Sequence, residues 1–128
     1  MKENIKGLQH IGIPTEKYDE TKSFYEKLGF IPYGETIIES SHKRVVFMKQ
    51  NNIEFEIYEV DLSAKCYGAI DHIAIDVKSI KEAYLFIEQC SFTILEKGIM
   101  ELPFKQKGVR YFTIVGPNEE KIEFYQLL

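Results

Sequence analysis

The chain has 128 residues, enough for one compact domain or for two very small half-domains that share a core. Its hydrophobic content of 45% and charged content of 28% are ordinary for a folded protein and argue against long disordered segments. The net charge of −4 disfavours nucleic acid as a partner, and no apolar run approaches the roughly 20 residues of a membrane helix. Because there is no signal-peptide pattern and Cys66 and Cys90 are isolated, we expect a cytoplasmic protein without a structural disulfide.

The first half of the sequence predicts a strand, a helix and three further strands. Residues alternate between the two faces of a strand over 7–14. Apolar residues then recur at helical spacing over about 17–28, and Gly29 ends the pattern. Three β-like runs follow, at about 31–39, 43–50 and 53–60, with a turn at Gln-Asn-Asn before the last.

The second half repeats this order. It predicts a strand at 69–77 and a helix at 79–89, which opens with the capping-box sequence from Ser79 to Glu82. Three strands follow, at about 92–98, 109–115 and 120–127. The sequence therefore predicts an α+β protein with the order βαβββ twice, as modules 5–62 and 68–128 of a single domain spanning 1–128.

Two segments carry this internal repeat most clearly, LQHIGIPT at 8–15 and IDHIAIDV at 70–77. A shift of 62 residues places His10 on His72, and later in each half a shift of 67 places Glu56 on Glu123. The second half thus has about five extra residues. We expect them in the segment ELPFKQKG, 101–108, because its Pro and Gly indicate a loop.

The repeated histidines and glutamates share one property, which is that each lies on the less apolar face of its predicted strand. Two imidazoles and two carboxylates are a suitable ligand set for a divalent transition metal. With four protein ligands, Ni²⁺, Co²⁺ or Mn²⁺ keeps two positions for water or substrate, and Zn²⁺ fits with an expanded shell. A single strand histidine is more often structural, but the joint pattern favours metal ligation by His10, Glu56, His72 and Glu123.

At this point the chain resembles the vicinal oxygen chelate superfamily, which includes glyoxalase I. The resemblance covers essentially the whole chain and is carried by QHIGI with the helix ending FYEKLGF, by FEIYE, by DHIAIDV and by GPNEEKIEFYQ. It implies the glyoxalase/bleomycin resistance fold, in which paired βαβββ modules form a U-shaped cleft around a metal ion. His10, Glu56, His72 and Glu123 match the four ligand positions of glyoxalase I.

The identity of these ligands separates the branches of the superfamily. Extradiol dioxygenases use two His and one Glu around iron, and antibiotic-binding members often lack the metal ligands. Methylmalonyl-CoA epimerases usually have Gln where Glu56 stands. Glu at both carboxylate positions therefore favours the glyoxalase-like branch.

The resemblance implies a lyase or isomerase of the lactoylglutathione lyase type. Such an enzyme moves a proton next to a carbonyl through a metal-bound enediolate, on a small α-oxygenated substrate. Glu123 is the expected base, with Glu56 as its counterpart. Pro14 and Val60 stand where glutathione-type glyoxalases have Arg and Asn, which argues against glutathione as part of the substrate.

Two alternatives stay open. One is a metal-dependent epimerase or fosfomycin-type enzyme that uses the same metal with different pocket groups. The other is a non-enzymatic protein that binds a small molecule such as an antibiotic.

Further residues are candidates for contacts with the small-molecule substrate. Tyr58 and Tyr125 share the ligand face, where they either shape the pocket or pack as filler. Arg44, Arg110 and Lys105 are candidates to receive an anionic group, the plainer interpretation being solvated charges. The loop 101–108 is either a lid or an ordinary surface loop. We also expect a homodimer, because small modules often cover their edge strands with a partner.

Overall fold

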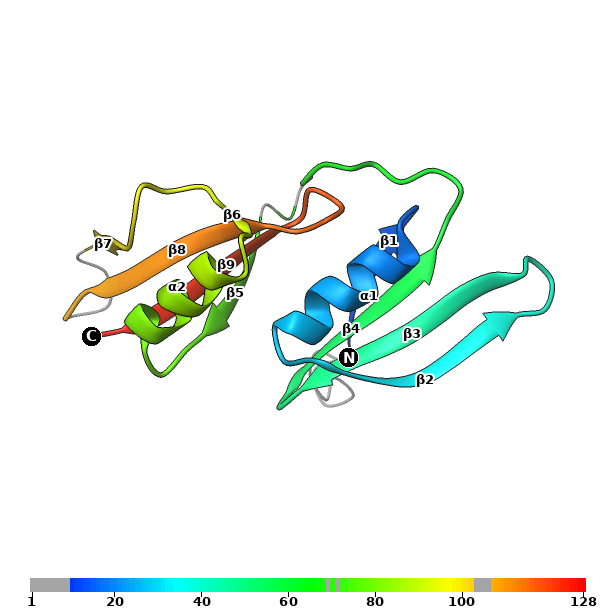
Figure 1. Ribbon diagram of the computed structural model, residues 1–128, viewed down its shortest axis with the longest axis horizontal. Coiled ribbons are helices and arrows are strands. Elements are labelled where there is room, and N and C mark those ends of the chain that lie inside the picture. Colours follow the sequence, from blue (N-terminus) through cyan, green and yellow to red (C-terminus); the bar gives the residue numbers. More distant parts are fainter. Residues whose placement is uncertain (1–9, 69, 71, 103–106) are drawn as a thin grey trace, which may run out of the picture. The chain divides into compact units, whose positions relative to one another are not determined.

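The computed structural model describes residues 10–68, 70, 72–102 and 107–128 (Figure 1). Contacts within the chain divide it into two compact units, Met1–Ser63 and Ala64–Leu128. Each unit places one helix against one sheet, which confirms the α+β fold of two βαβββ modules. In the described part of the chain, neither helix has the length and apolar character needed to cross a membrane.

The N-terminal unit has the element order predicted from the sequence. Its elements are β1 (Ile11–Thr15), α1 (Tyr18–Lys27), β2 (Ile31–Ile38), β3 (Lys43–Gln50) and β4 (Ile53–Glu59). The sheet order is β1-β4-β3-β2, in which β1 runs parallel to β4 and the other pairs are antiparallel. Residues 7–9 of the predicted first strand lie outside the described residues.

An aromatic cluster forms the core between α1 and this sheet. Tyr25 on α1 and Phe55 on β4 are both fully buried, and their ring centroids lie 4.8 Å apart. Phe30 lies 5.1 Å from Phe55 and 5.7 Å from Tyr25. Gly29 has a φ of +93°, a conformation that glycine adopts readily, and it turns the chain so that Phe30 enters this cluster.

The C-terminal unit builds the same layers. Its elements are β5 (Ile73–Asp76), α2 (Ile80–Gln89), β6 (Thr93–Ile94), β7 (Met100–Leu102), β8 (Val109–Val115) and β9 (Lys121–Leu127). The sheet order is β5-β9-β8-β6, and β7 also pairs with β8. The hydroxyl of Ser79 accepts a hydrogen bond from the Glu82 N–H at 3.3 Å, which confirms Ser79 as the predicted helix cap.

The edge of this second sheet differs from the prediction of one strand over 92–98. The edge strand is split, because β6 pairs with one end of β8 and β7 with the other. Residues 96–99 lie between these two parts of the edge strand, so part of the extra length lies there and not only in 101–108. The strand β7 also reaches into that predicted loop, whose residues 103–106 lie outside the described residues.

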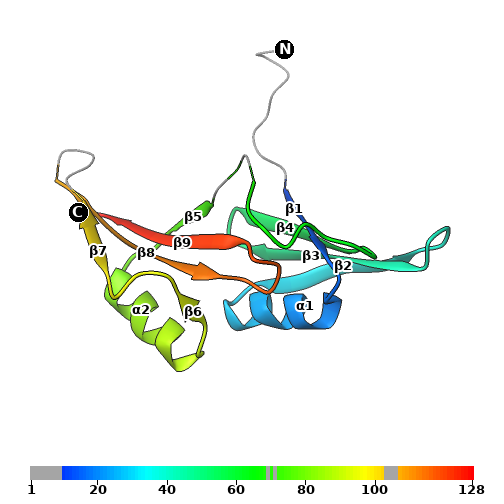
Figure 2. The same ribbon diagram turned by 90° about the horizontal axis from the view of Figure 1, so that it is seen from above.

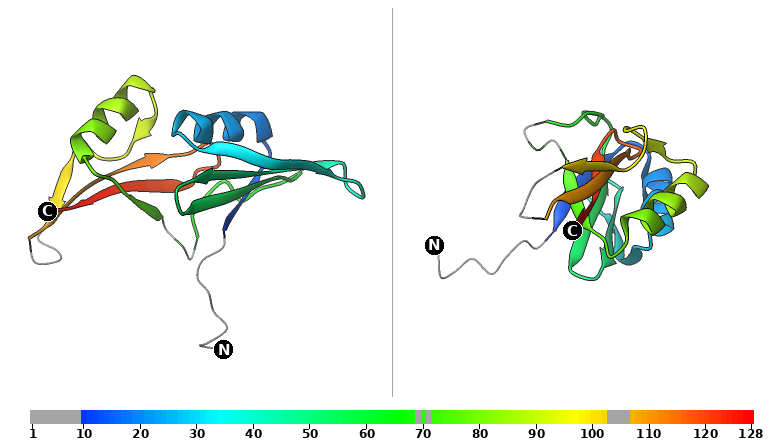
Figure 3. Two further views of the ribbon diagram at one scale, coloured as in Figure 1. Left: turned by 90° about the horizontal axis from the view of Figure 1, so that it is seen from below. Right: turned by 90° about the vertical axis from the view of Figure 1, so that its left-hand side faces the viewer.

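Each sheet thus has one face covered by its helix, and no helix of the described residues lies on the other (Figures 2 and 3). The helix-covered face carries the fully buried residues of β3, β4, β8 and β9, which include Val46, Phe55, Phe112 and Ile122. We call the other side of each sheet its open face. Side chains on the open face are the ones available to a ligand.

The aromatic cluster sets a stability expectation. We expect Phe55→Ala to lower the free energy of unfolding by about 3–5 kcal/mol, because it empties a fully buried ring position. Urea denaturation followed by circular dichroism measures this change. Leu62→Ala is the control, since that side chain is 84% exposed and its loss should cost less than about 0.5 kcal/mol. Equal effects of the two substitutions would contradict this core.

Candidate functional site

The predicted ligands of the N-terminal unit lie on its open face. Strand register places Gly12, Glu56 and Phe47 in one row across β1, β4 and β3. The neighbouring residues Phe55 and Ile57 on β4 are fully buried against the helix side. Because side chains alternate along a strand, Glu56 points away from α1. His10 immediately precedes β1 and has the same alternation as Gly12.

His10 and Glu56 form a close pair. The Nε2 atom of His10 lies 3.2 Å from Oε2 of Glu56, and the two side chains are 34% and 30% exposed. A Cβ atom at Gly12 would stand 3.4 Å from the Tyr58 ring and 4.0 Å from Glu56 Oε2. Glycine at position 12 therefore leaves room beside the pair. The His10 ring meets Phe47 edge-on, with 5.8 Å between centroids.

His72 and Glu123 form the corresponding pair in the C-terminal unit. His72 Nε2 lies 4.0 Å from Oε2 of Glu123, whose side chain is only 15% exposed. Burial raises the pKa of Glu123, the electrostatic influence of the neighbouring His72 opposes this effect, and repulsion from Glu96 adds to it. A carboxyl group that loses hydration in this way holds its proton more tightly than an exposed one.

Sequence reasoning did not identify Glu96, which lies in the break between β6 and β7. Its two carboxylate oxygens accept hydrogen bonds from the Thr113 N–H at 2.7 Å and from the Thr113 hydroxyl at 2.8 Å. The Glu96 carboxylate thus accepts the hydrogen bond that a backbone carbonyl of a continuous edge strand would accept. Thr113 in turn pairs with Glu123 across β8 and β9. The equivalent position in the first half of the chain is not a glutamate, so comparison of the two halves did not single out Glu96.

The two units place different groups beside their His–Glu pairs. Phe47 stands opposite Glu56, whereas Thr113 stands opposite Glu123. The His10–Glu56 pair therefore has an aromatic neighbour, Phe47. The His72–Glu123 pair has a polar neighbour, Thr113, which is hydrogen-bonded to another acid, Glu96. Among the described residues, no group of three or more His, Cys, Asp or Glu side chains is placed to hold a metal ion.

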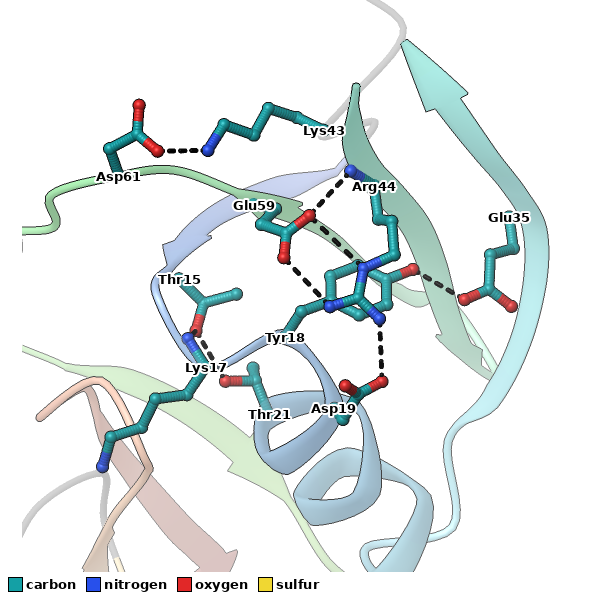
Figure 4. A network of polar contacts seen from close by, with 10 residues as sticks. All are labelled: Thr15, Lys17, Tyr18, Asp19, Thr21, Glu35, Lys43, Arg44, Glu59 and Asp61. Carbon is teal, nitrogen blue, oxygen red and sulfur yellow. Dashed lines mark hydrogen bonds and ion pairs between the residues drawn. The ribbon is translucent and has the colours of Figure 1, made fainter. Parts of the chain in front are cut away.

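Arg44 is engaged in a network on the helix-covered side of its sheet (Figure 4). Its Nη2 donates to Glu59 Oε1 at 2.9 Å, its Nε to Oε2 of the same residue at 3.3 Å, and its Nη1 to Asp19 at 3.0 Å. The guanidinium lies 4.2 Å from the Tyr18 ring centroid. These contacts give Arg44 a structural role and use its donors within the unit.

The remaining predicted substrate residues are distributed differently. Tyr58 and Tyr125 have the alternation of Glu56 and Glu123 and lie on the open faces. Arg110 donates to Glu101 at 2.9 Å and has the alternation of the buried Phe112. Lys105 lies outside the described residues.

The burial of Glu123 predicts a pH-dependent effect on stability. Because the folded chain holds this proton more tightly than the unfolded chain, stability falls as the pH rises through the ordinary value of 4.5 toward the raised pKa. Glu123→Gln removes this cost, so we expect the metal-free variant to be more stable than the parent at pH 7. This gain in stability should disappear at pH values below the ordinary glutamate pKa of 4.5. Urea denaturation in EDTA at several pH values measures it.

The control for this experiment is Glu119→Gln, which removes an exposed carboxylate from the same unit. It should show no such pH-dependent gain. A Glu123→Gln protein less stable than the parent at pH 7 would contradict the account of a desolvated carboxyl group.

The Arg44 network predicts the opposite pH dependence. Arg44→Gln should lower the free energy of unfolding at neutral pH by about 0.5–1.5 kcal/mol, because two partly exposed charge-assisted contacts are lost. Hydrogen bonds from Arg44 lower the pKa of Glu59, so the loss should shrink at acidic pH as this carboxylate becomes protonated. Arg110→Gln breaks a single exposed pair and serves as control in the same urea measurement. Similar losses for both variants would show that the network adds nothing.

The chain has relatives in sequence and in fold, although no model of a known protein family matches it. The "Uncharacterized protein YwbC" of Bacillus subtilis (strain 168) is 30% identical over 128 residues, which cover 94% of this chain and 98% of that protein. The fold is similar to that of a glyoxalase family protein from Enterococcus faecalis, with a TM-score of 0.80, 23% identity and coverage of 94% and 97%.

A second solved structure carries a metal. The fosfomycin resistance protein FosX from Listeria monocytogenes, in complex with Mn(II) and sulfate, has a TM-score of 0.75 and 16% identity, with coverage of 97% of this chain and 94% of FosX. The chain therefore belongs to the same family as YwbC of Bacillus subtilis, and it has the fold seen in the glyoxalase family protein and in FosX.

Proposed function

We propose that this protein is a metal-dependent enzyme that moves a proton next to a carbonyl group in a small α-oxygenated substrate, as a glyoxalase-I-like lyase or isomerase. The observation that carries the proposal is the repeated His–Glu pair. His10 with Glu56 and His72 with Glu123 occupy equivalent positions on the open faces of two sheets. A packing role for the four residues does not require that each histidine meet a carboxylate in both units.

The donor atoms fit a divalent ion. Ligand bonds of about 2.0–2.2 Å to one metal ion leave neighbouring donors on the order of 3 Å apart. The 3.2 Å separation in the first pair matches this value, and the 4.0 Å separation in the second needs a small side-chain rotation. Imidazole nitrogen and carboxylate oxygen suit Ni²⁺, Co²⁺, Zn²⁺ and Mn²⁺. We propose that these four residues are ligands of such an ion. The Mn(II) in FosX supports a divalent ion by analogy.

Each residue has a distinct task in this proposal. When bound, the divalent ion supplies a Lewis acid that polarises a substrate oxygen. Glu123 takes the proton from the substrate carbon at a carboxylate oxygen and returns it to the neighbouring carbon. Its low exposure keeps water away from that oxygen. Glu56, the more exposed counterpart, stays with His10.

The surrounding residues complete the proposed site. Tyr58 and Tyr125 lie on the open faces of their sheets, where we expect them to contact the substrate. Lys105 remains a candidate for an anionic group, whereas Arg110 is paired with Glu101 on the helix-covered side, and we retain the homodimer expected from the sequence. Pro14 lies on β1 and Val60 directly after β4, where neither supplies a charge or an amide for glutathione.

A fosfomycin-type enzyme is the second candidate, and the similarity to FosX supports it at the level of the fold. An epimerase would use the same ligands with a different substrate pocket. A non-enzymatic binding protein has no need of two His–Glu pairs. Metal binding therefore separates the enzymes from the binder, and substrate trials separate the enzymes from one another.

Metal titration tests the proposal first. We expect isothermal titration calorimetry with Mn²⁺ and Ni²⁺ to give about one ion per chain for the parent protein and a loss of at least 10-fold in affinity for His72→Ala, because a direct ligand is removed. Glu101→Gln removes an exposed carboxylate of the same unit that is paired with Arg110, and should leave affinity unchanged. Failure of the parent to bind either ion at millimolar concentration would overturn the metal site and favour the binding protein.

Activity assays on the metal-loaded protein then decide the reaction. We expect proton transfer on a methylglyoxal–thiol adduct or a related α-oxygenated carbonyl compound, and a loss of most turnover in Glu123→Gln while some metal is retained. Fosfomycin opening and methylmalonyl-CoA epimerisation are the competing assays. An active Glu123→Gln enzyme would remove Glu123 from the role of base.

A further inference from the structure

A pocket of about 430 Å³ opens in the N-terminal unit, apart from the His10–Glu56 pair. It lies where β2 begins beside the end of β3, and Ile31 pairs with Lys49 across these two strands. The residues that line it are Gly29, Ile31, Tyr33, Lys49, Gln50 and Asn51. All of them belong to one compact unit, so the pocket does not depend on the other half of the chain.

One side of the pocket is apolar. Ile31 is 69% exposed and Tyr33 is 45% exposed, which is unusual for two large side chains on one short stretch of strand. The Tyr33 ring lies 5.8 Å from Phe47, and Phe47 lies 5.8 Å from His10. An aromatic strip of Tyr33 and Phe47 therefore leads from the His–Glu pair to this pocket along the open face.

The other side of the pocket is cationic. Lys49 is exposed, and its ammonium group makes no ion pair or hydrogen bond with any residue that the structure describes. Glu54 stands opposite Lys49 in the β3–β4 register, but this carboxylate accepts the hydroxyl hydrogen of Tyr33. That hydrogen bond keeps Tyr33 in its neutral form. Lys49 thus remains an available positive charge beside an apolar wall.

Amide groups complete the rim. Gly29 has a φ of +93°, and a Cβ atom there would stand 3.1 Å from the amide nitrogen of Gln50. Glycine therefore allows the Gln50 side chain to lie close to the chain at this point. Asn51 adds a second side-chain amide from the hairpin turn. An ammonium and amide N–H groups around an apolar wall form a suitable environment for the end of an organic anion.

We propose that this pocket binds the carboxylate end of an organic acid whose apolar or aromatic body lies along Tyr33 and Phe47. Two residues along β3 and one strand spacing separate Lys49 from Glu56, which gives a span on the order of 8–9 Å. The substrate class is then an α-oxygenated carbonyl compound that carries a carboxylate about six to eight atoms away. This naming of the substrate rests on the proposed function, whereas binding of the acid itself does not.

The test uses the full chain without metal, so that it stands apart from the metal site. The ¹⁵N-labelled protein in EDTA is titrated with 4-phenylbutyrate and with the uncharged 4-phenylbutanamide, and shifts are followed by NMR. We expect millimolar binding of the acid, with the largest shifts at residues 29–33 and 49–51, and at least 5-fold weaker binding of the amide. Butyrate, which lacks the ring, should also bind at least 5-fold more weakly.

Single substitutions test the contributions of the Lys49 charge and of the apolar side chain of Ile31 separately. Lys49→Gln should weaken 4-phenylbutyrate at least 5-fold, and Lys27→Gln, which removes an exposed lysine of the same unit, should not. Ile31→Ser should weaken the acid and the amide alike. The spectrum of each variant shows whether it is folded.

Three outcomes would overturn the proposal. Equal affinity for acid and amide would mean that the pocket is only an apolar patch, and equal loss in both lysine variants would mean that net charge alone attracts the ligand. Shifts confined to other residues would place the ligand elsewhere. A parent protein that binds the acid but no Mn²⁺ would overturn the metal enzyme and leave this pocket standing, so the two failures are distinguishable.

Discussion

Parallel pairing of β1 with β4 is the constraint on which the candidate site depends. This pairing sets Gly12 beside Glu56 and Ile13 beside Ile57, so one face receives the buried isoleucines and the other receives the carboxylate. A slip of one residue would exchange the two faces and bury Glu56 against α1 at a prohibitive cost. Burial of the helix-facing residues therefore fixes the register, and the register fixes which ligands face outward. Pairing of β5 with β9 does the same for Glu123.

The two units share this framework but have diverged on their open faces. Where the first sheet continues through β2 to Tyr33 and Ile31, the second sheet breaks its edge strand and inserts Glu96. The first unit consequently offers an aromatic surface that leads to a lysine, and the second offers a partly buried carboxyl group with another acid nearby. The first open face is suited to an apolar organic group, and the second to acid–base chemistry.

Several parts of this arrangement were predictable from the sequence. Strand alternation and the repeat shift identified His10, Glu56, His72 and Glu123, because side-chain direction in a strand follows directly from residue spacing. The helix cap at Ser79 was also predictable, since it depends on residues close in sequence.

Other features depend on tertiary contacts that no local pattern reveals. The split between β6 and β7 could not be predicted, because it depends on which residues of β8 have a partner at the sheet edge. The role of Glu96 depends on its hydrogen bonds to Thr113, which only the structure reveals. The sequence identifies Arg44 as a charged residue, but its partner Asp19 lies 25 residues earlier, on α1, so no local pattern links the two. The pocket beside Lys49 combines residues from a helix end, two strands and a turn.

The central claim is that the His–Glu pair of each repeat binds a divalent ion. Anomalous diffraction from crystals of the Mn²⁺-loaded protein tests it most directly. The account predicts manganese bonded to His10, Glu56, His72 and Glu123, with further positions taken by solvent or substrate. Manganese bound by only one of the two pairs, or by neither, would contradict it.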